Sequence, residues 1–123
     1  MEVKVGYVVE GFNDERAVLA VFPDSYIAVT KGTRYNRRVR MDIQKIIGEC
    51  NVVFVLTDPD EPGNNLAEYI SQEFGLLRIM IDPKEAICYR NGKKKIGVEH
   101  CDPVYLKMVL TDALKEEIFS SNQ

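Results

Sequence analysis

The chain has 123 residues, of which 46% are hydrophobic and 28% are charged, and its formal net charge is −3. This length supports one hydrophobic core and excludes two independent domains. No apolar run reaches the roughly eighteen residues of a membrane span, and the first residues lack the basic and apolar regions of a secretory signal. We therefore expect a cytoplasmic protein with no membrane partner. We expect one domain over 1–123, with a core over about 3–119 and a loose tail at 120–123.

Apolar residues alternate along the chain between the period of strands and the period of helices. Asn13 or Asp14 can cap the first helix, and Pro23 ends it. Pro62 suits the first turn of the third helix. The pattern predicts, in chain order, strands over 3–9, 26–30, 51–57 and 76–81 and helices over about 14–22, 37–48, 62–75 and 103–119.

The predicted strand over 51–57 indicates the fold class. It is a continuous apolar run, as expected for a strand that helices cover on both faces. Strands that alternate with helices favour a parallel sheet. We therefore expect an α/β, Rossmann-like fold with a mainly parallel four-stranded sheet and helices on both faces. The stretch 82–101, in contrast, is expected to be a long irregular connection with a turn over Arg90–Lys93.

Acidic residues stand where two of the predicted strands end. Glu10 follows the first strand, and Asp58 and Asp60 follow the third, with Pro59 between them. In a doubly wound sheet these strands are neighbours, so Glu10 and Asp58 are expected about 5 Å apart. Converging carboxylates repel one another unless a cation neutralises them, and Mg²⁺ prefers carboxylate and phosphate oxygens. The alternative is that Asp60 or Glu61 only caps the following helix.

Basic residues gather in two segments despite the negative net charge. Six of the sixteen lie between positions 31 and 45, and five lie between 84 and 95. Lys31, Arg34 and Arg37 flank the acidic loops and are candidates for contacts with a nucleic-acid backbone. His100, the only histidine, is a candidate for a phosphate contact or proton transfer, and Glu99 for an acid that supports the ligands. The alternatives are a solvated surface for the basic residues and a structural role for His100.

Several motifs resemble the Toprim domain, which topoisomerases, bacterial primases, OLD-family nucleases and RecR-type repair proteins share. Val8–Gly11 and Thr57–Asp60 are similar to its two signature motifs. The resemblance covers Val5–His100. A closer resemblance, to the bacterial ribonucleases that mature 5S ribosomal RNA precursors, is carried by Leu56–Gly63, Ile96–His100 and Lys31–Thr33 with Asn36.

The resemblance implies roles for the three acidic residues. It makes Glu10 a general acid/base or metal ligand, and it makes Asp58 and Asp60 ligands of Mg²⁺, with Mn²⁺ as a substitute. The implied activity is Mg²⁺-dependent phosphodiester chemistry of a ribonuclease-like hydrolase, with RNA favoured over DNA. The maturation enzymes carry a further domain beyond their Toprim portion. We therefore expect a small stand-alone form of the domain. The resemblance does not identify its substrate, and a partner protein can contribute to recognition of that substrate.

Two other interpretations remain open from the sequence alone. A non-catalytic module would bind nucleic acid or a protein through the same edge of the sheet without turnover. A receiver-like phosphoacceptor also places an aspartate after its third strand, as Asp58 is here. That fold needs a lysine after a fifth strand, and no such strand is visible in the sequence.

Overall fold

The structure is a computed structural model that describes residues 2–121. The strands of its main sheet are β1 (Val5–Val9), β2 (Tyr26–Val29), β3 (Val52–Val55) and β4 (Leu77–Arg78). The sheet is parallel, and the strand order is β2-β1-β3-β4. The register pairs Val8 with Ala28 on one side and with Val55 on the other. The predicted four-stranded parallel sheet is confirmed, with β1 and β3 as neighbours.

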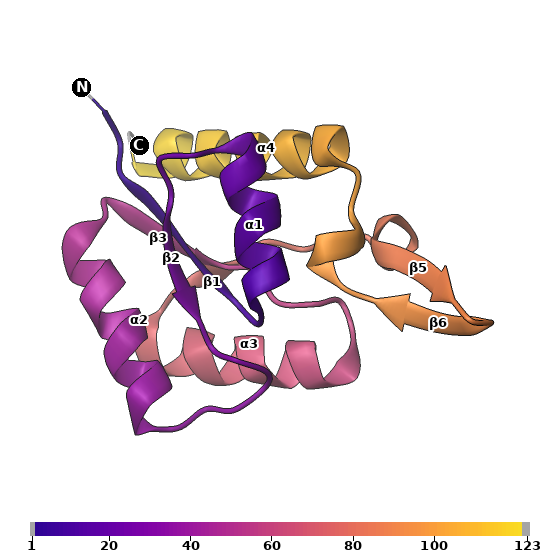
Figure 1. Ribbon diagram of the computed structural model, residues 1–123. Helices are drawn as coiled ribbons and strands as arrows, with labels where there is room; N and C mark the ends of the chain where they lie inside the picture. Colours follow the sequence, from indigo (N-terminus) through magenta and orange to yellow (C-terminus); the bar gives the residue numbers. More distant parts are fainter. Residues whose placement is uncertain (1, 122–123) are drawn as a thin grey trace.

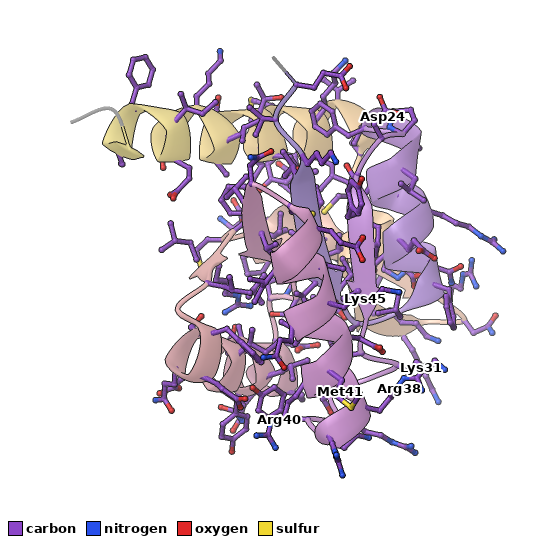
Figure 2. The ribbon with its side chains drawn as sticks, turned by 90° about the vertical axis from the view of Figure 1, so that its left-hand side faces the viewer. Asp24, Lys31, Arg38, Arg40, Met41 and Lys45 are labelled. Carbon is purple, nitrogen blue, oxygen red and sulfur yellow. The ribbon has the colours of Figure 1, made fainter. Side chains whose placement is uncertain are left out.

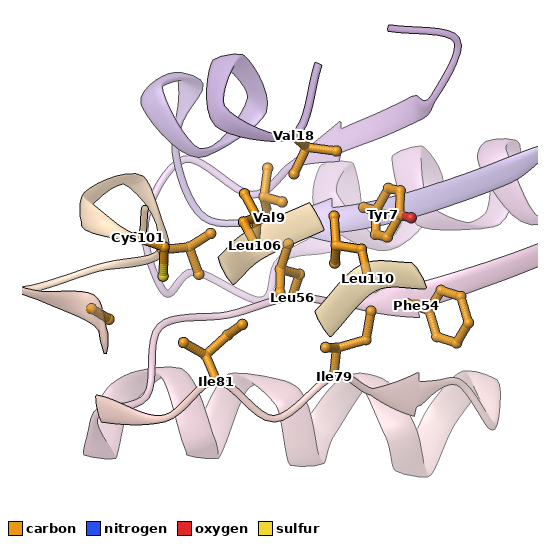
Figure 3. Packing of buried hydrophobic residues seen from close by; sticks show 12 residues of the cluster. Tyr7, Val9, Val18, Phe54, Leu56, Ile79, Ile81, Cys101, Leu106 and Leu110 are labelled. Atoms are coloured by element: carbon orange, nitrogen blue, oxygen red, sulfur yellow. The ribbon is translucent and has the colours of Figure 1, made fainter. Parts of the chain in front are cut away.

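Four helices cover the two faces of this sheet (Figure 1). They are α1 (Phe12–Val21), α2 (Arg37–Glu49), α3 (Glu61–Phe74) and α4 (Pro103–Ser121). Successive strand residues point to opposite faces, so β1 directs Val9 to one face and Val8 to the other. On the first face, Val9 and Leu56 pack with Val18 of α1 and Leu106 of α4 (Figure 3).

The second face of the sheet is covered by α2 and α3. Val8 and Val55 pack there with Ile43 of α2 and with Leu66 and Ile70 of α3. All five side chains are almost completely buried. Two apolar clusters therefore hold the sheet in place, and the carboxyl ends of its strands form one fixed edge.

The starts of the helices have local causes. Asn36 caps α2, because its side chain accepts the Val39 N–H at 3.0 Å. The expectation that Asn13 or Asp14 caps α1 is wrong. Gly11 is the capping residue, and Asp14 stands inside the first turn.

The stretch between β4 and α4 is regular, so the expectation of an irregular connection is wrong. A short 3₁₀ turn, η1 (Pro83–Ala86), leads to the antiparallel hairpin of β5 (Ile87–Arg90) and β6 (Lys93–Ile96). A second 3₁₀ turn, η2 (Val98–His100), follows. The predicted turn is confirmed, since Asn91 and Gly92 have φ values of 52° and 74°. The hairpin projects from the body of the molecule, away from α2 (Figure 1).

Two boundaries differ from the prediction. The regular part of β4 is only Leu77–Arg78, because pairing with β3 stops there. Helix α4 continues through residues 120–121, so the expected loose tail does not begin at 120. Residues 122 and 123 lie outside the described part of the chain. Within residues 2–121, no helix combines the length and the hydropathy that a membrane span needs.

Candidate functional site

Glu10 and Asp58 meet at the edge of the sheet where β1 and β3 end. Glu10 directly follows β1, and only 9% of its surface is exposed. Its Oε2 atom accepts the Asp58 N–H at 2.6 Å. The structure therefore brings together the two acids that the strand order predicted to be neighbours.

Asp58 is also held by a segment that is distant in the sequence. Its Oδ1 atom accepts the Val98 N–H at 2.8 Å. Gly97 lies against the same atom, because a Cβ placed on Gly97 would be 3.6 Å from Asp58 Oδ1. The segment that follows β6 therefore forms one wall of the site.

Asp60 has a structural contact as well as a place near the other acids. It caps α3, since its Oδ1 atom accepts the Gly63 N–H at 2.8 Å. The Thr57 hydroxyl donates to the Gly63 carbonyl oxygen at 2.8 Å. A Cβ on Gly63 would clash with the Asp58 carbonyl oxygen, so glycine allows α3 to begin this close to the loop. Asp60 therefore caps α3, and its charge also acts on Glu10, so its role as a ligand stays a prediction.

A fourth carboxylate, Asp14, belongs to the site, although the sequence suggested only a capping role for it. Asp14 is 6% exposed. Its Oδ2 atom accepts the Gly11 N–H at 3.1 Å, and its Oδ1 atom accepts the Glu99 N–H at 3.0 Å. The sequence signal for Asp14 is its position three residues after the capping residue, Gly11. An acid at this position stabilises the first turn of a helix. The contact with Glu99, 85 residues away, has no such signal.

We term Glu10, Asp14, Asp58 and Asp60 the acidic centre. Burial, together with the charges of Asp58, Asp60 and Asp14, raises the pKa of Glu10 from 4.5 to about 7, although the hydrogen bond from the Asp58 N–H opposes the shift. Burial, followed by the charge of Asp58, raises the pKa of Asp14 from 3.8 to about 7. Burial also raises the pKa of Asp58, although the hydrogen bond from the Val98 N–H opposes the shift. Such perturbed acids are typical of functional sites, and a pKa near 7 suits proton transfer at neutral pH.

Arg78 is the cation beside the acidic centre and was not singled out in the sequence. It lies on β4, and its Nη2 atom donates to the Asp58 carbonyl oxygen at 3.1 Å. Its Nε atom is buried, and no atom of residues 2–121 is a hydrogen-bond partner for it. Burial lowers the pKa of Arg78, whereas the charges of Glu10, Asp60 and Asp58 raise it. One feature of the sequence indicates a special role for Arg78: it is the one charged residue in the otherwise apolar run 76–81.

Lys31 and Arg34 lie on the exposed segment between β2 and α2, and Arg37 is the first residue of α2. The segment is next to the acidic centre, because the Gly32 N–H donates to the backbone oxygen of Glu10 at 2.8 Å. All three basic side chains are exposed, and within residues 2–121 none of them forms an ion pair. Figure 2 shows Lys31 close to the end at which α2 begins. Their predicted contacts with nucleic acid stay predictions.

His100 and Glu99 lie on η2 at the border of the acidic centre. His100 Nε2 is 3.3 Å from Glu99 Oε1, and the His100 side chain is 16% exposed. The backbone of Glu99 is held by Asp14. Both residues are therefore near the centre, and their predicted roles as a phosphate or proton contact and as a supporting acid stay predictions.

The comparison with protein families explains this arrangement. The Toprim domain matches residues 5–91, from β1 to the turn of the hairpin. The chain belongs to the Toprim domain family. This confirms the resemblance carried by the two acidic motifs, and the strands that end in those motifs are the core of the matched region.

Ribonuclease M5 proteins are among the relatives of this Toprim domain. The one from Staphylococcus aureus is 35% identical over 112 residues, which are 89% of this chain and 60% of that protein. The one from Bacillus subtilis is 29% identical over 116 residues, which are 94% of this chain and 61% of that protein. The chain thus spans about 60% of the length of these relatives.

A solved structure supports the fold. The small TOPRIM domain protein from Bacillus stearothermophilus superposes with a TM-score of 0.70 at 24% sequence identity. The match covers 92% of this chain and 90% of that chain. At this identity the likeness shows that the α/β Toprim fold is shared, and it carries no statement about activity.

The donor atoms of this Toprim domain suit a hard divalent cation. Mg²⁺ usually takes one or two protein carboxylates and keeps several waters. A cation would also relieve the repulsion that helps to raise the pKa of Glu10. In the described residues, no three Asp, Glu, His or Cys side chains are already arranged to hold an ion. Glu10 and Asp58 are the pair best placed to share one, and the ligand roles of Glu10, Asp58 and Asp60 stay predictions.

Proposed function

We propose that this Toprim domain catalyses Mg²⁺-dependent cleavage of phosphodiester bonds in nucleic acid, as a ribonuclease-like endonuclease that favours RNA over DNA in the cytoplasm. The observation that supports it best is the 2.6 Å contact between buried Glu10 and Asp58, at an edge where Arg78 also lies. The similarity to two ribonuclease M5 proteins supports nuclease chemistry and RNA. Those proteins are longer, so their full activity and substrates are transferred here only as a proposal.

The chemistry needs a proton donor or acceptor near the reacting phosphate. In hydrolysis, a water oxygen forms a bond to phosphorus while the bond from phosphorus to the leaving sugar oxygen breaks. The water loses a proton, and the leaving oxygen gains one. Where Glu10 does not ligate a cation, its pKa of about 7 suits it to accept or donate that proton near neutral pH. Its other proposed role is that of a metal ligand.

Charge is the second requirement, because the phosphate becomes more negative as the reaction proceeds. Glu10 and Asp58 would hold Mg²⁺ or its substitute Mn²⁺, with Asp60 as a third acid on the same loop. The bound ion would polarise the phosphate and activate the attacking water. Arg78 would add a guanidinium, whose buried Nε–H has no partner in the described part of the chain.

The flanking residues would position the substrate. Lys31, Arg34 and Arg37 would bind phosphates on the side of the β2–α2 segment. His100 would contact a phosphate or transfer a proton, and Glu99 would orient it through the 3.3 Å contact between their side chains. A partner protein that contributes to recognition of the target is compatible with this arrangement.

The alternative function is a module that binds nucleic acid or a protein without turnover. One observation favours it: Glu10, Asp58 and Asp60 each already accept a backbone N–H. Such contacts compete with metal binding, so a test must separate binding from cleavage.

The test is a cleavage assay on structured RNA with Mg²⁺ or Mn²⁺ and a matched pair of variants. Asp58→Asn should abolish cleavage, with a loss larger than the about 10- to 100-fold that follows removal of a group that only supports a ligand. Glu61→Gln is the control, because Glu61 is an exposed acid three residues further along. Cleavage that survives Asp58→Asn would contradict the proposal, and binding without any cleavage by the wild type would favour the alternative.

A further inference from the structure

The β5–β6 hairpin has a basic face to which the proposed function gives no role. The register pairs Arg90 with Lys93 and Cys88 with Lys95. Neighbouring residues of a strand point to opposite faces, so these four residues share one face of the hairpin. We term them the basic face. The opposite face includes Ile96, which packs against the core.

The basic face is on the same side of β6 as the acidic centre. Gly97 continues β6, because its N–H donates to the Ala86 carbonyl oxygen at 3.0 Å and its backbone is extended. A Cβ on Gly97 would point toward Asp58 Oδ1, 3.6 Å away. Since alternate residues share a face, Lys95 and Lys93 lie on the side of β6 that faces Asp58.

The positive charges of this face are not neutralised within the protein. Arg90, Lys93 and Lys95 are exposed, and the described residues 2–121 provide no ion pair for any of them. Arg90 and Lys93 are directly opposite each other, and like charges in such cross-strand pairs destabilise a sheet. A two-stranded hairpin is itself of marginal stability. A polyanion bound to this face would remove the repulsion.

The spacing also fits a phosphate backbone. Same-face residues of a strand are about 6.6 Å apart. Two nucleotides of one strand of duplex DNA rise by about 6.8 Å along its axis. The two-residue turn at Asn91 and Gly92 fixes the register of the hairpin before any ligand binds. Lys95 and Lys93 thus form a row of cations that begins at the acidic centre and leads away from it.

We infer that the basic face binds the phosphate backbone of the nucleic-acid segment next to the bond held at the acidic centre. The inference rests on the proposed function for the class of substrate. It adds the path of the nucleic acid along the protein surface. Its chemistry is the phosphodiester backbone that RNA and DNA share. The contacts are with phosphates, so they contribute affinity and orientation and do not read the sequence.

The test measures binding to RNA and DNA duplexes of one sequence over a range of salt concentrations, in the presence of a chelator. The variant Lys93→Gln/Lys95→Gln should weaken binding and reduce the slope of log K against log salt by about 2, one for each lost phosphate contact. Lys93→Arg/Lys95→Arg should retain the wild-type slope. Equal changes on both duplexes indicate a backbone contact, and a loss confined to RNA indicates a contact that includes the 2′-hydroxyl.

The matched control is Lys4→Gln/Lys115→Gln, which removes two exposed lysines from the start of β1 and from α4. It should leave the slope unchanged. A wild type that binds and cleaves, with an unchanged slope in Lys93→Gln/Lys95→Gln, would overturn the inference and leave the proposed function standing. A wild type that neither binds nor cleaves would overturn both. Circular dichroism checks that each variant is folded.

Discussion

The acidic centre and the basic face are two charged regions that are built in opposite ways. In the acidic centre, Glu10 and Asp14 are buried, and Glu10, Asp14, Asp58 and Asp60 each accept at least one backbone N–H. On the basic face, the cations are exposed, and in the described residues no anion pairs with them. The two regions are joined directly, since Gly97 and Val98 follow β6 and contact Asp58.

This difference separates two uses of charge. Burial and fixed hydrogen bonds shift the pKa of an acid and hold its oxygens in place, which are the conditions for proton transfer and metal binding. Exposed lysines and arginines keep their hydration and their mobility, and they attract a polyanion at a modest cost in ordering. Changes in the acidic centre should therefore affect cleavage and folding, whereas changes on the basic face should affect affinity and its salt dependence.

Gly63→Ala should have the largest effect, because the new Cβ would clash with the Asp58 carbonyl oxygen and lie 2.9 Å from Asp60 Oδ1. The start of α3 must then move, and the Asp58–Asp60 loop must move with it. We expect the free energy of unfolding to fall by about 1–3 kcal/mol and cleavage to be lost. Urea denaturation and the cleavage assay measure the two effects.

The control for this prediction is Gly48→Ala in α2. Apart from its chain neighbours and the adjacent backbone of α2, no heavy atom of the described residues lies within 4 Å of the Cβ that the substitution would add. Alanine is favoured over glycine inside a helix by about 0.5–1 kcal/mol, so the free energy of unfolding should stay the same or rise, with full cleavage. Equal destabilisation by both substitutions would show that the close contact at Gly63 is not the cause.

Arg78→Met should mainly affect the rate of cleavage. The substitution removes the donor to the Asp58 carbonyl oxygen and the buried Nε–H, while it keeps much of the aliphatic stem. Loss of one donor that stabilises developing charge typically lowers a rate by about 100- to 1,000-fold. Single-turnover kinetics measure it, with Arg16→Met as the control, because Arg16 is exposed on α1. An unchanged rate in Arg78→Met would contradict a role for Arg78.

The stability of the protein in a chelator should fall as pH rises from about 5 to 8. The folded-state pKa values of Glu10 and Asp14 are about 7, above their ordinary values of 4.5 and 3.8. In this window the folded protein therefore keeps protons that the unfolded chain has lost, and stability falls until both acids are ionised. Melting temperatures should be several degrees lower at pH 8 than at pH 5. Glu10→Gln should reduce this slope, and a wild-type melting temperature that rises over the window would contradict the assignment.

The sequence was sufficient for the sheet and for the main acidic pair, for a physical reason. Parallel strands joined by helices leave few possible orders, and strand ends in such a sheet share one edge. Glu10 and Asp58 could therefore be placed together from their positions after apolar runs. The capping role of Asp60 was left as an alternative, because an acid at the start of a helix serves either purpose.

The remaining parts of the site depend on contacts that no local pattern contains. Asp14 is fixed by the backbone of Glu99, and Arg78 reaches Asp58 because β4 pairs with β3. The hairpin strands were not predicted, because their four basic residues gather at the turn and neither strand alternates apolar and polar residues, although the turn at Asn91 was visible. Tertiary contacts decided the first two cases, and pairing across the turn decided the third.

The central claim is that Glu10 and Asp58 share a divalent cation at this edge of the sheet. Crystals soaked with Mn²⁺, at a concentration that supports cleavage, test it most directly. We expect an anomalous density peak about 2 Å from a carboxylate oxygen of each of Glu10 and Asp58, with Asp60 adjacent. No peak there, with both carboxylates still bound to backbone N–H groups, would contradict the account.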